Sequence, residues 1–231
     1  MQPLKIVFTM VSPIIVDNEN PFHLDALLAA RVCEEAQSLG SDNAWADADD
    51  LSAYLERADF EHDWVWKASA LQFTPHERMP FVLSQMNMLR RSDPEGVYDA
   101  LDRGDWESTR KINPKTWKID TVSGQNRTYQ WIAQMRYVSR MTAWCVGDEH
   151  AIADALSRVS GIGKMRRNGF GRVGSVSVEA APAHERDHWM LRVMPHGAAG
   201  LPGVAYEPVI SALRAPYWRK TRAVVAQEPL I

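Results

Sequence analysis

The chain has 231 residues, a net charge of −3 and 45% hydrophobic residues, values that fit a globular protein with a packed core. No apolar run is long enough to span a membrane, and the opening Met-Gln-Pro-Leu-Lys is unlike a secretory signal. The two cysteines, Cys33 and Cys145, form no CxxC pair, so we expect a reduced, cytoplasmic protein without a disulfide framework.

Charge is distributed unevenly along the chain. Residues 1–102 carry 7 basic and 18 acidic side chains, whereas residues 103–172 carry 13 basic and 6 acidic ones. For binding a polyanion, a local basic surface matters more than the net charge. The middle third is therefore a candidate nucleic-acid surface, although the same charges also fit a solvated face that pairs with the acidic first third.

The first predicted element is a strand over 4–16, rich in apolar and β-branched residues and bent or ended near Pro13. A turn is expected at 17–21. Apolar residues at helical spacing over 23–37 then predict a helix that stops before Gly40.

The centre of the chain shows weaker patterns. The acidic residues 41–63 include one short predicted helix around 51–57. Residues 64–73 alternate apolar and polar side chains, which is typical of a strand, and 79–88 is its predicted hairpin partner. Residues 89–128 are rich in charged residues, Gly and Pro, so we interpret them as an excursion from the core, mainly loop with short helix.

Regular patterns return at 129–146, an aromatic and β-prone stretch that predicts one or two strands. Asp148 is a suitable N-cap for the helix that follows. That helix has apolar residues at 152, 155, 156 and 159 on one face, and Gly161 is expected to close it.

Two more strands are predicted, at 172–179 and 189–194, and the tail from Pro202 onward has little periodicity. Strands and helices thus mix without strict alternation. This order predicts one α+β domain over 1–231 with an antiparallel sheet, such as a ferredoxin-like core.

The segment 161–174 holds five glycines and four cationic side chains in fourteen positions, without an acidic residue. Glycine lets the backbone approach a ligand closely, and Lys and Arg donate charge-assisted hydrogen bonds to phosphate oxygens. The pattern suits either an extended sugar-phosphate chain or a tight, solvated connection between two elements.

Two nucleotide motifs are excluded by their context. A Rossmann GxGxxG must follow a strand and open a helix, but at 169–174 the predicted order is the reverse. Gly163-Lys164 resembles the end of a P-loop, yet Met165 stands where Ser or Thr must hold magnesium. We therefore expect no nucleotide hydrolysis.

The sequence His184-Glu185-Arg186-Asp187-His188 matches the HExxH of zinc peptidases. Pro182 lies just upstream, and Met194 occupies the position where a third ligand belongs. A chance match in a polar turn is the favoured interpretation, and we expect neither a metal nor another cofactor.

His23, at the start of the first predicted helix, is the other notable histidine. It is a possible general base for metal-free RNA cleavage. The sequence fixes no partner acid or base, so a helix-start residue that bonds a turn is the favoured interpretation.

The basic third also contains four of the nine tryptophans: Trp106, Trp117, Trp131 and Trp144. Aromatic rings stack on unpaired bases while cations hold phosphates. Trp131 and Trp144 lie in strand-like segments, where core packing is expected, so Trp117 is the better stacking candidate. The candidate nucleic-acid contacts around it are Arg110, Lys111, Lys115, Trp117, Lys118 and Arg127.

The order of a helix, a G-x-G-[KR]-x(4)-G-F-G loop and a strand, in the C-terminal half of an α+β chain, resembles the RAMP superfamily of CRISPR proteins. In that superfamily the loop grips CRISPR RNA on a ferredoxin-like (RRM-like) core. Pro13-Ile-Ile-Val16 followed by Pro21-Phe-His-Leu-Asp-Ala-Leu-Leu-Ala29 is similar to the start of the Csf-type, Cas-five-family subunit of type IV CRISPR complexes. Residues 41–140 and the tail match in arrangement only.

This resemblance implies a non-catalytic subunit that caps the five-prime handle of the guide RNA (crRNA). It would adjoin a Cas-seven-type backbone subunit and the large-subunit-like Csf protein, near the PAM of the target DNA. An inserted, thumb-like region within about 89–140 would press on the guide, and the tail would be a C-terminal extension. The residues implied to hold the handle are Gly161, Gly163, Lys164, Arg166, Arg167, Asn168, Gly169, Phe170, Gly171 and Arg172.

Two alternatives stay open on the sequence. A guide-processing endoribonuclease of the Cas-six type shares the core and the glycine-rich loop, and it would use His23 or a nearby Tyr or Arg at the cleaved 2′-OH. A zinc peptidase using the HExxH residues is the remote alternative.

Overall fold

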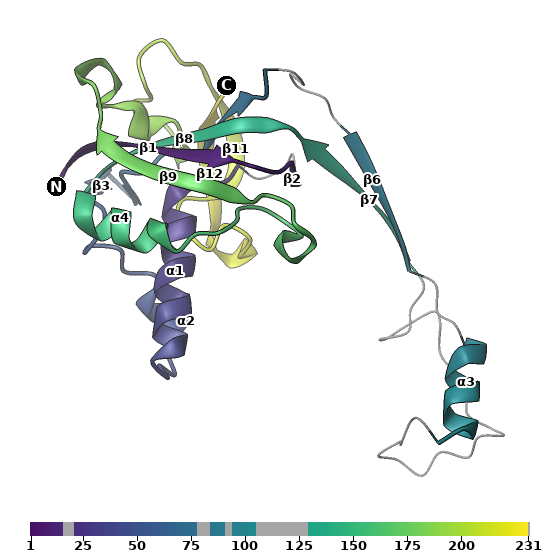
Figure 1. Cartoon of the computed structure of the whole chain (residues 1–231). Helices are drawn as coiled ribbons and strands as arrows, with labels where there is room; N and C mark the ends of the chain where they lie inside the picture. Colours follow the sequence, from purple (N-terminus) through teal and green to yellow (C-terminus); the bar gives the residue numbers. More distant parts are fainter. Residues whose placement is uncertain (16–20, 78–83, 91–93, 105–128, 231) are drawn as a thin grey trace. The chain divides into compact units, whose positions relative to one another are not determined.

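The structure is a computed structural model that describes residues 1–15, 21–77, 84–90, 94–104 and 129–230. The chain divides into two compact units. The first comprises Met1–Leu83 and Met135–Ile231, and the second comprises Ser84–Gln134. Figure 1 shows the course of the chain through its helices and strands.

The first unit is built on an antiparallel sheet of four strands in the spatial order β5–β8–β1–β9. These strands are β1 (Gln2–Met10), β5 (Gln72–Pro75), β8 (Val138–Gly147) and β9 (Val173–Ala180). Helix α1 (Leu24–Ser38) comes between β1 and β5, and α4 (Glu149–Ser157) joins β8 to β9. Mixed helices and antiparallel sheets make the fold α+β, as predicted.

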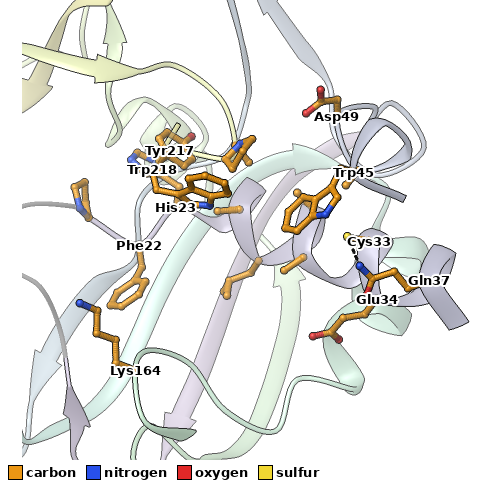
Figure 2. Close-up of a pocket in the computed structure, with 18 residues that line it drawn as sticks. Phe22, His23, Cys33, Glu34, Gln37, Trp45, Asp49, Lys164, Tyr217 and Trp218 are labelled. Carbon is orange, nitrogen blue, oxygen red and sulfur yellow. Dashed lines mark hydrogen bonds between the residues drawn. The ribbon is translucent and has the colours of Figure 1, made fainter. Parts of the chain in front are cut away.

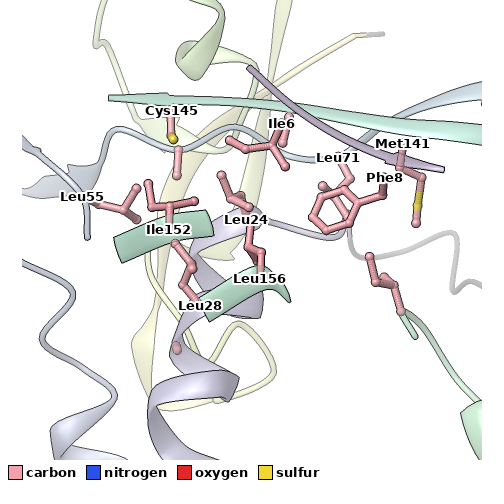
Figure 3. Close-up of a cluster of buried hydrophobic side chains, with 14 of the residues drawn as sticks. Ile6, Phe8, Leu24, Leu28, Leu55, Leu71, Met141, Cys145, Ile152 and Leu156 are labelled. Carbon is pink, nitrogen blue, oxygen red and sulfur yellow. The ribbon is translucent and has the colours of Figure 1, made fainter. Parts of the chain in front are cut away.

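Both helices cover the same face of this sheet (Figure 1). Side chains alternate along β1, so Leu4, Ile6 and Phe8 are fully buried while Lys5 and Val7 are partly exposed. Each fully buried apolar side chain contributes about 1.5–3 kcal/mol to folding. Figure 3 shows the centre of this core, where the sheet meets the helix residues Leu24, Leu28, Ile152 and Leu156.

The C-terminal part of the first unit forms a second, smaller sheet in the order β10–β12–β11. Its strands are β10 (Met194–Pro195), β11 (Tyr206–Ala212) and β12 (Ala223–Pro229). Beside it is the pair β3 (Arg57–Asp59) and β4 (Trp64–Trp66), whereas the short helix α2 (Ala44–Asp47) packs against α1. The second core cluster comprises Val65, Trp189, Val193, Met194, Leu213 and Ala226.

The second unit contains β6 (Ser84–Arg90), α3 (Pro94–Asp102) and most of β7 (Tyr129–Arg136). Strand β6 lies beside β7 in a sheet. The last two residues of β7, which belong to the first unit, pair with β2 (Ile14–Ile15). Among the described residues, the predicted pairing of 79–88 with 64–73 is therefore wrong.

Elements with strong local signals are confirmed. Helix α1 begins one residue after His23, and two strands occupy 129–147 as expected. The Asp148 side chain accepts a hydrogen bond from the Ala151 N–H at 2.9 Å and so caps α4. Strand β9 matches the predicted strand over 172–179.

Three predictions are corrected at the ends of elements or in short ones. Residues 51–57 make a single turn instead of a helix, in which the Leu55 N–H donates to the Leu51 carbonyl at 2.8 Å. Residues 64–73 hold two short strands, β4 and the start of β5, instead of one. Gly161 does not close α4, which ends at Ser157; it forms a β-bridge with Arg172.

Two further corrections concern the C-terminal region. The predicted strand over 189–194 is mainly a 3-10 turn, His188–Met190, followed by the two-residue β10. The tail from Pro202 onward, whose sequence shows little periodicity, contains β11 and β12. None of the helices in the described ranges is long and apolar enough to cross a membrane.

One buried charge joins the parts of the first unit. The guanidinium of Arg192 is fully buried and donates hydrogen bonds to the carbonyls of Ala68 (3.0 Å) and Leu213 (2.6 Å). It also donates to the Tyr217 hydroxyl at 2.7 Å and to the Asp25 carboxylate at 3.4 Å. The first turn of α1, the strand connection at 66–68 and the segment at 213–217 thus meet at one side chain.

The acceptor side of this network is equally buried. Burial raises the pKa of Asp25, while the charge of Arg192 and a hydrogen bond from Tyr217 oppose that shift. The Tyr217 hydroxyl donates to the Asp25 carboxylate at 2.8 Å. Because a buried charge is tolerated only when it is paired and hydrogen-bonded, each of these three groups depends on the other two.

Replacement of Arg192 by methionine tests this dependence. We expect Arg192→Met to lower the free energy of unfolding by about 3–5 kcal/mol, because the Asp25 carboxylate and several carbonyls lose their buried partner. The matched control is Arg186→Met, since the Arg186 side chain is 68% exposed. Its effect should stay within about 0.5 kcal/mol. Urea denaturation of both variants measures their free energies of unfolding. Equal losses for the two would contradict the role given to Arg192 in joining the parts of the first unit.

Candidate functional site

The glycine-rich segment 161–174 folds back on itself between α4 and β9. The Ile162 N–H donates to the Gly171 carbonyl at 2.8 Å, and Gly161 bridges Arg172. At its tip is a single 3-10 turn, Arg166–Asn168, flanked by residues with positive φ. The segment is therefore a closed loop whose two ends are hydrogen-bonded to each other.

The base of this loop is fixed to the link between β1 and β2. The Gly171 N–H donates to the Pro13 carbonyl at 2.7 Å, and the Lys164 N–H donates to the Ile15 carbonyl at 3.2 Å. The Arg172 N–H donates to the Ser12 hydroxyl at 2.8 Å. The two stretches that carried the family resemblance, the N-terminal motif and the glycine-rich loop, thus lie side by side.

The glycines of the loop have different roles. A Cβ on Gly171, where φ is +63°, would lie 1.8 Å from the Ile162 carbonyl oxygen, and both Gly161 and Gly171 are buried. Gly169, where φ is +90°, has no atom within 4 Å of such a Cβ and is exposed. Gly171 is therefore needed for the close return of the chain, and Gly169 is the glycine that a ligand could approach closely.

The cationic side chains of the loop lie on the surface. Lys164, Arg166, Arg167 and Arg172 are exposed, as is Asn168, while Phe170 is half-buried. Arg166 donates to the Gly161 carbonyl at 3.5 Å. Within the described part of the chain, Arg167 and Arg172 form no ion pair. The loop thus presents donors for an anionic ligand without an acidic neighbour in its own sequence.

His23 is buried, with 1% of its surface exposed, and its ring stacks on Tyr217 with 4.1 Å between centroids. Its side chain does not cap α1, and neither ring nitrogen has a hydrogen-bond partner among the described residues. Burial, and then the charge of Arg192, lower the pKa of His23 well below its ordinary value. The expectation that this side chain bonds a turn is wrong.

The HExxH residues do not lie on one helix. His184 and Glu185 fall in one 3-10 turn and His188 begins another, whereas zinc peptidases present both histidines from one helical face. The Glu185 carboxylate accepts hydrogen bonds from Lys5 at 3.0 Å and from the Trp144 indole at 2.7 Å. This glutamate is thus part of a packed surface, and Trp144 is buried as expected.

The candidate nucleic-acid contacts around Trp117 cannot be compared with the structure. Arg110, Lys111, Lys115, Trp117, Lys118 and Arg127 lie outside the described residues. They stay predictions from the sequence.

A pocket that no sequence pattern indicates lies beside the loop. A cavity of about 490 Å³ lies along α1, between that helix and the segment 215–218, and Lys164 of the loop is in its lining (Figure 2). Two exposed tryptophans, Trp45 and Trp218, are also in the lining. The residues that form the pocket walls are almost 200 positions apart, so they make no local pattern in the sequence. The one sequence feature that points to such a site is the large number of tryptophans.

The sequence was compared with models of known protein families. The sequence model of one family, described as CRISPR type IV associated protein Csf3, matches residues 2–229. No curated protein matches the chain.

Alanine at the two glycines tests the distinction drawn within the loop. We expect Gly169→Ala to cost about 1–2 kcal/mol of unfolding free energy, the strain of a left-handed residue with a Cβ. Gly171→Ala should cost about 2–5 kcal/mol, because the same strain is joined by a clash with the Ile162 carbonyl. Urea denaturation of the two variants gives the comparison, and a larger loss for Gly169→Ala would refute it.

The buried histidine predicts a pH dependence of stability. His23 titrates below its ordinary pKa in the folded state, so the unfolded chain takes up a proton below about pH 6.5 that the folded chain excludes. The free energy of unfolding therefore falls as the pH drops below about 6.5, by up to about 1.4 kcal/mol per pH unit.

We expect His23→Phe, which keeps a ring against Tyr217, to remove this dependence. The variant's unfolding free energy should rise relative to wild type as the pH falls from about 6.5 to about 5. Urea denaturation at several pH values measures the change, and a difference that does not vary with pH would rule out a buried, neutral His23.

Proposed function

We propose that this chain, which belongs to the Csf3 family of type IV CRISPR-associated proteins, is the RNA-binding subunit that caps the five-prime handle of the guide RNA. The family match covers residues 2–229, nearly the whole chain, and gives the association with type IV CRISPR systems. The observation that carries the RNA-binding role is the exposed, cationic tip of a loop whose base is fixed to β1 and β2.

The chemistry of the loop suits a chain of phosphates. Lys164, Arg166, Arg167 and Arg172 are exposed within nine consecutive residues, so they can contact successive phosphate groups. Arg166 and Arg167 project from one 3-10 turn, and the hydrogen bonds to Pro13 and Ile15 hold that turn in place. A loop that is ordered before binding loses less conformational entropy when it binds.

The RAMP assignment of the fold is part of the same proposal. The elements β1, α1, β5, β8, α4 and β9 follow the order β-α-β-β-α-β, with both helices on one face of the sheet. That order is characteristic of the ferredoxin-like fold. It supports a RAMP core of the Cas-five type, with the second sheet, β10–β12–β11, as the C-terminal extension.

We further propose that the subunit holds the guide RNA without cutting it. The nitrogens of His23 are buried beneath Tyr217, and a general base must reach the proton that it removes. This burial argues against the Cas-six-type mechanism. In the complex, the subunit would contact a Cas-seven-type backbone subunit, the large-subunit-like Csf protein and target DNA near the PAM; membership of the family supports these partners.

Removal of the two tip arginines tests RNA binding. We expect Arg166→Ala/Arg167→Ala to weaken binding of labelled repeat RNA from the same CRISPR array. Because about two phosphate contacts are lost, the slope of log K against log salt concentration should fall by about 1.4. Fluorescence anisotropy at several salt concentrations measures both quantities.

Arg186→Ala, an exposed arginine outside the loop, is the matched control and should leave the slope unchanged. RNA recovered after incubation without metal should keep its full length. Wild-type protein that fails to bind the repeat RNA, or that cleaves it at one site, would overturn the proposed role.

A further inference from the structure

The pocket beside the loop has an aromatic end and a mixed end. Figure 2 shows Phe22, Tyr217 and Trp218 around His23 on the side of Lys164, and Trp45 of α2 with Gln37 and Glu34 of α1 on the other side. Trp218 is 72% exposed, although tryptophan side chains are on average largely buried. The aromatic end therefore offers flat surfaces for a planar ligand.

Two of these aromatic walls, His23 and Tyr217, are held in place by their neighbours. The rings of His23 and Tyr217 are nearly parallel, with 11° between their planes. Tyr217 is fixed in turn by its hydrogen bonds with Asp25 and Arg192. A preformed platform of this kind suits stacking because few side-chain rotamers are lost when a ring is added.

The same end contains buried polar groups without partners. The Nδ1 and Nε2 atoms of His23 have no hydrogen-bond partner within the described ranges, and the pKa of the ring is lowered so that it stays neutral. Because the ring is buried and uncharged, it adds no charge to this end of the pocket and serves as the support on which Tyr217 stacks.

The pocket is continuous with the glycine-rich loop. Lys164 contributes its backbone N–H to the bond that fixes the loop and its side chain to the pocket lining. Lys164 thus connects the cationic loop to the lining of the pocket. The two carboxylates of the lining, Glu34 and Asp49, are already paired with Arg31 and Arg222, so they offer no open charge to a peptide.

We propose that the pocket between Phe22, His23, Tyr217 and Trp218 binds one unstacked nucleobase of the RNA whose backbone lies on the loop. The base stacks on the exposed indole of Trp218, beside the stacked pair of His23 and Tyr217. This inference rests on the proposed RNA-binding function and adds a base-binding subsite to it. The α1 helix and the C-terminal segment, which are far apart in sequence, build that subsite together.

Truncation of the two exposed tryptophans of the lining, Trp218 and Trp45 of α2, tests the proposal. We expect Trp218→Ala to weaken binding of the repeat RNA by about 5- to 100-fold, the effect of losing one base–aromatic stack. The salt slope should not change, because no phosphate contact is removed. Trp45→Ala, which removes a 62% exposed indole at the other end, should leave the affinity unchanged.

A second readout locates the base. Repeat RNAs that carry 2-aminopurine at one position at a time should show one position whose fluorescence differs between wild type and Trp218→Ala. The absence of such a position would overturn the proposal.

The outcomes separate this inference from the proposed function. RNA binding that is weakened by Arg166→Ala/Arg167→Ala but not by Trp218→Ala would overturn the base pocket and leave the loop's role intact. An equal loss for Trp45→Ala would also overturn it, since the whole groove would then take part, as in docking of a peptide. Wild-type protein that does not bind the RNA would overturn both.

Discussion

The buried guanidinium of Arg192 is the constraint on which the first unit depends. It is fully buried, so its charge requires a complete set of acceptors, and these come from three parts of the chain. Satisfying that requirement brings the C-terminal segment against the start of α1 and places Tyr217 on His23. The aromatic end of the pocket is a consequence of where this one charge is buried.

The glycine-rich loop contains buried residues that fix its shape and exposed residues that can contact a ligand. Gly171, one of its two buried glycines, lets the chain return within contact distance of Ile162, and backbone amides of the loop donate hydrogen bonds to Pro13 and Ile15. The exposed cations are thereby presented from a fixed base rather than from a flexible connection. This arrangement concentrates positive charge in a loop whose own sequence contains no acidic residue, in a protein whose net charge is −3. A local basic surface therefore exists despite the acidic first third.

Much of the fold was predictable because its signals are local. The apolar spacing of α1, the Asp148 cap and the β-branched strands that form β8 and β9 depend on residues within a few positions of each other. The predictions failed where a short segment takes its structure from distant partners. Residues 206–229 form strands because β11 and β12 pair with each other and pack on Val65 and Trp189, which no local period reveals.

The sequence by itself determined the α+β class, the type IV CRISPR resemblance and the cationic, glycine-rich loop, because each is a property of contiguous residues. The tertiary structure alone decided which loop residues are exposed, that His23 is buried and neutral, and that Lys164 borders an aromatic pocket. The physical reason is that burial and hydrogen bonding of polar groups depend on contacts between distant segments. Arg192, unremarkable in the sequence, sets several of those contacts.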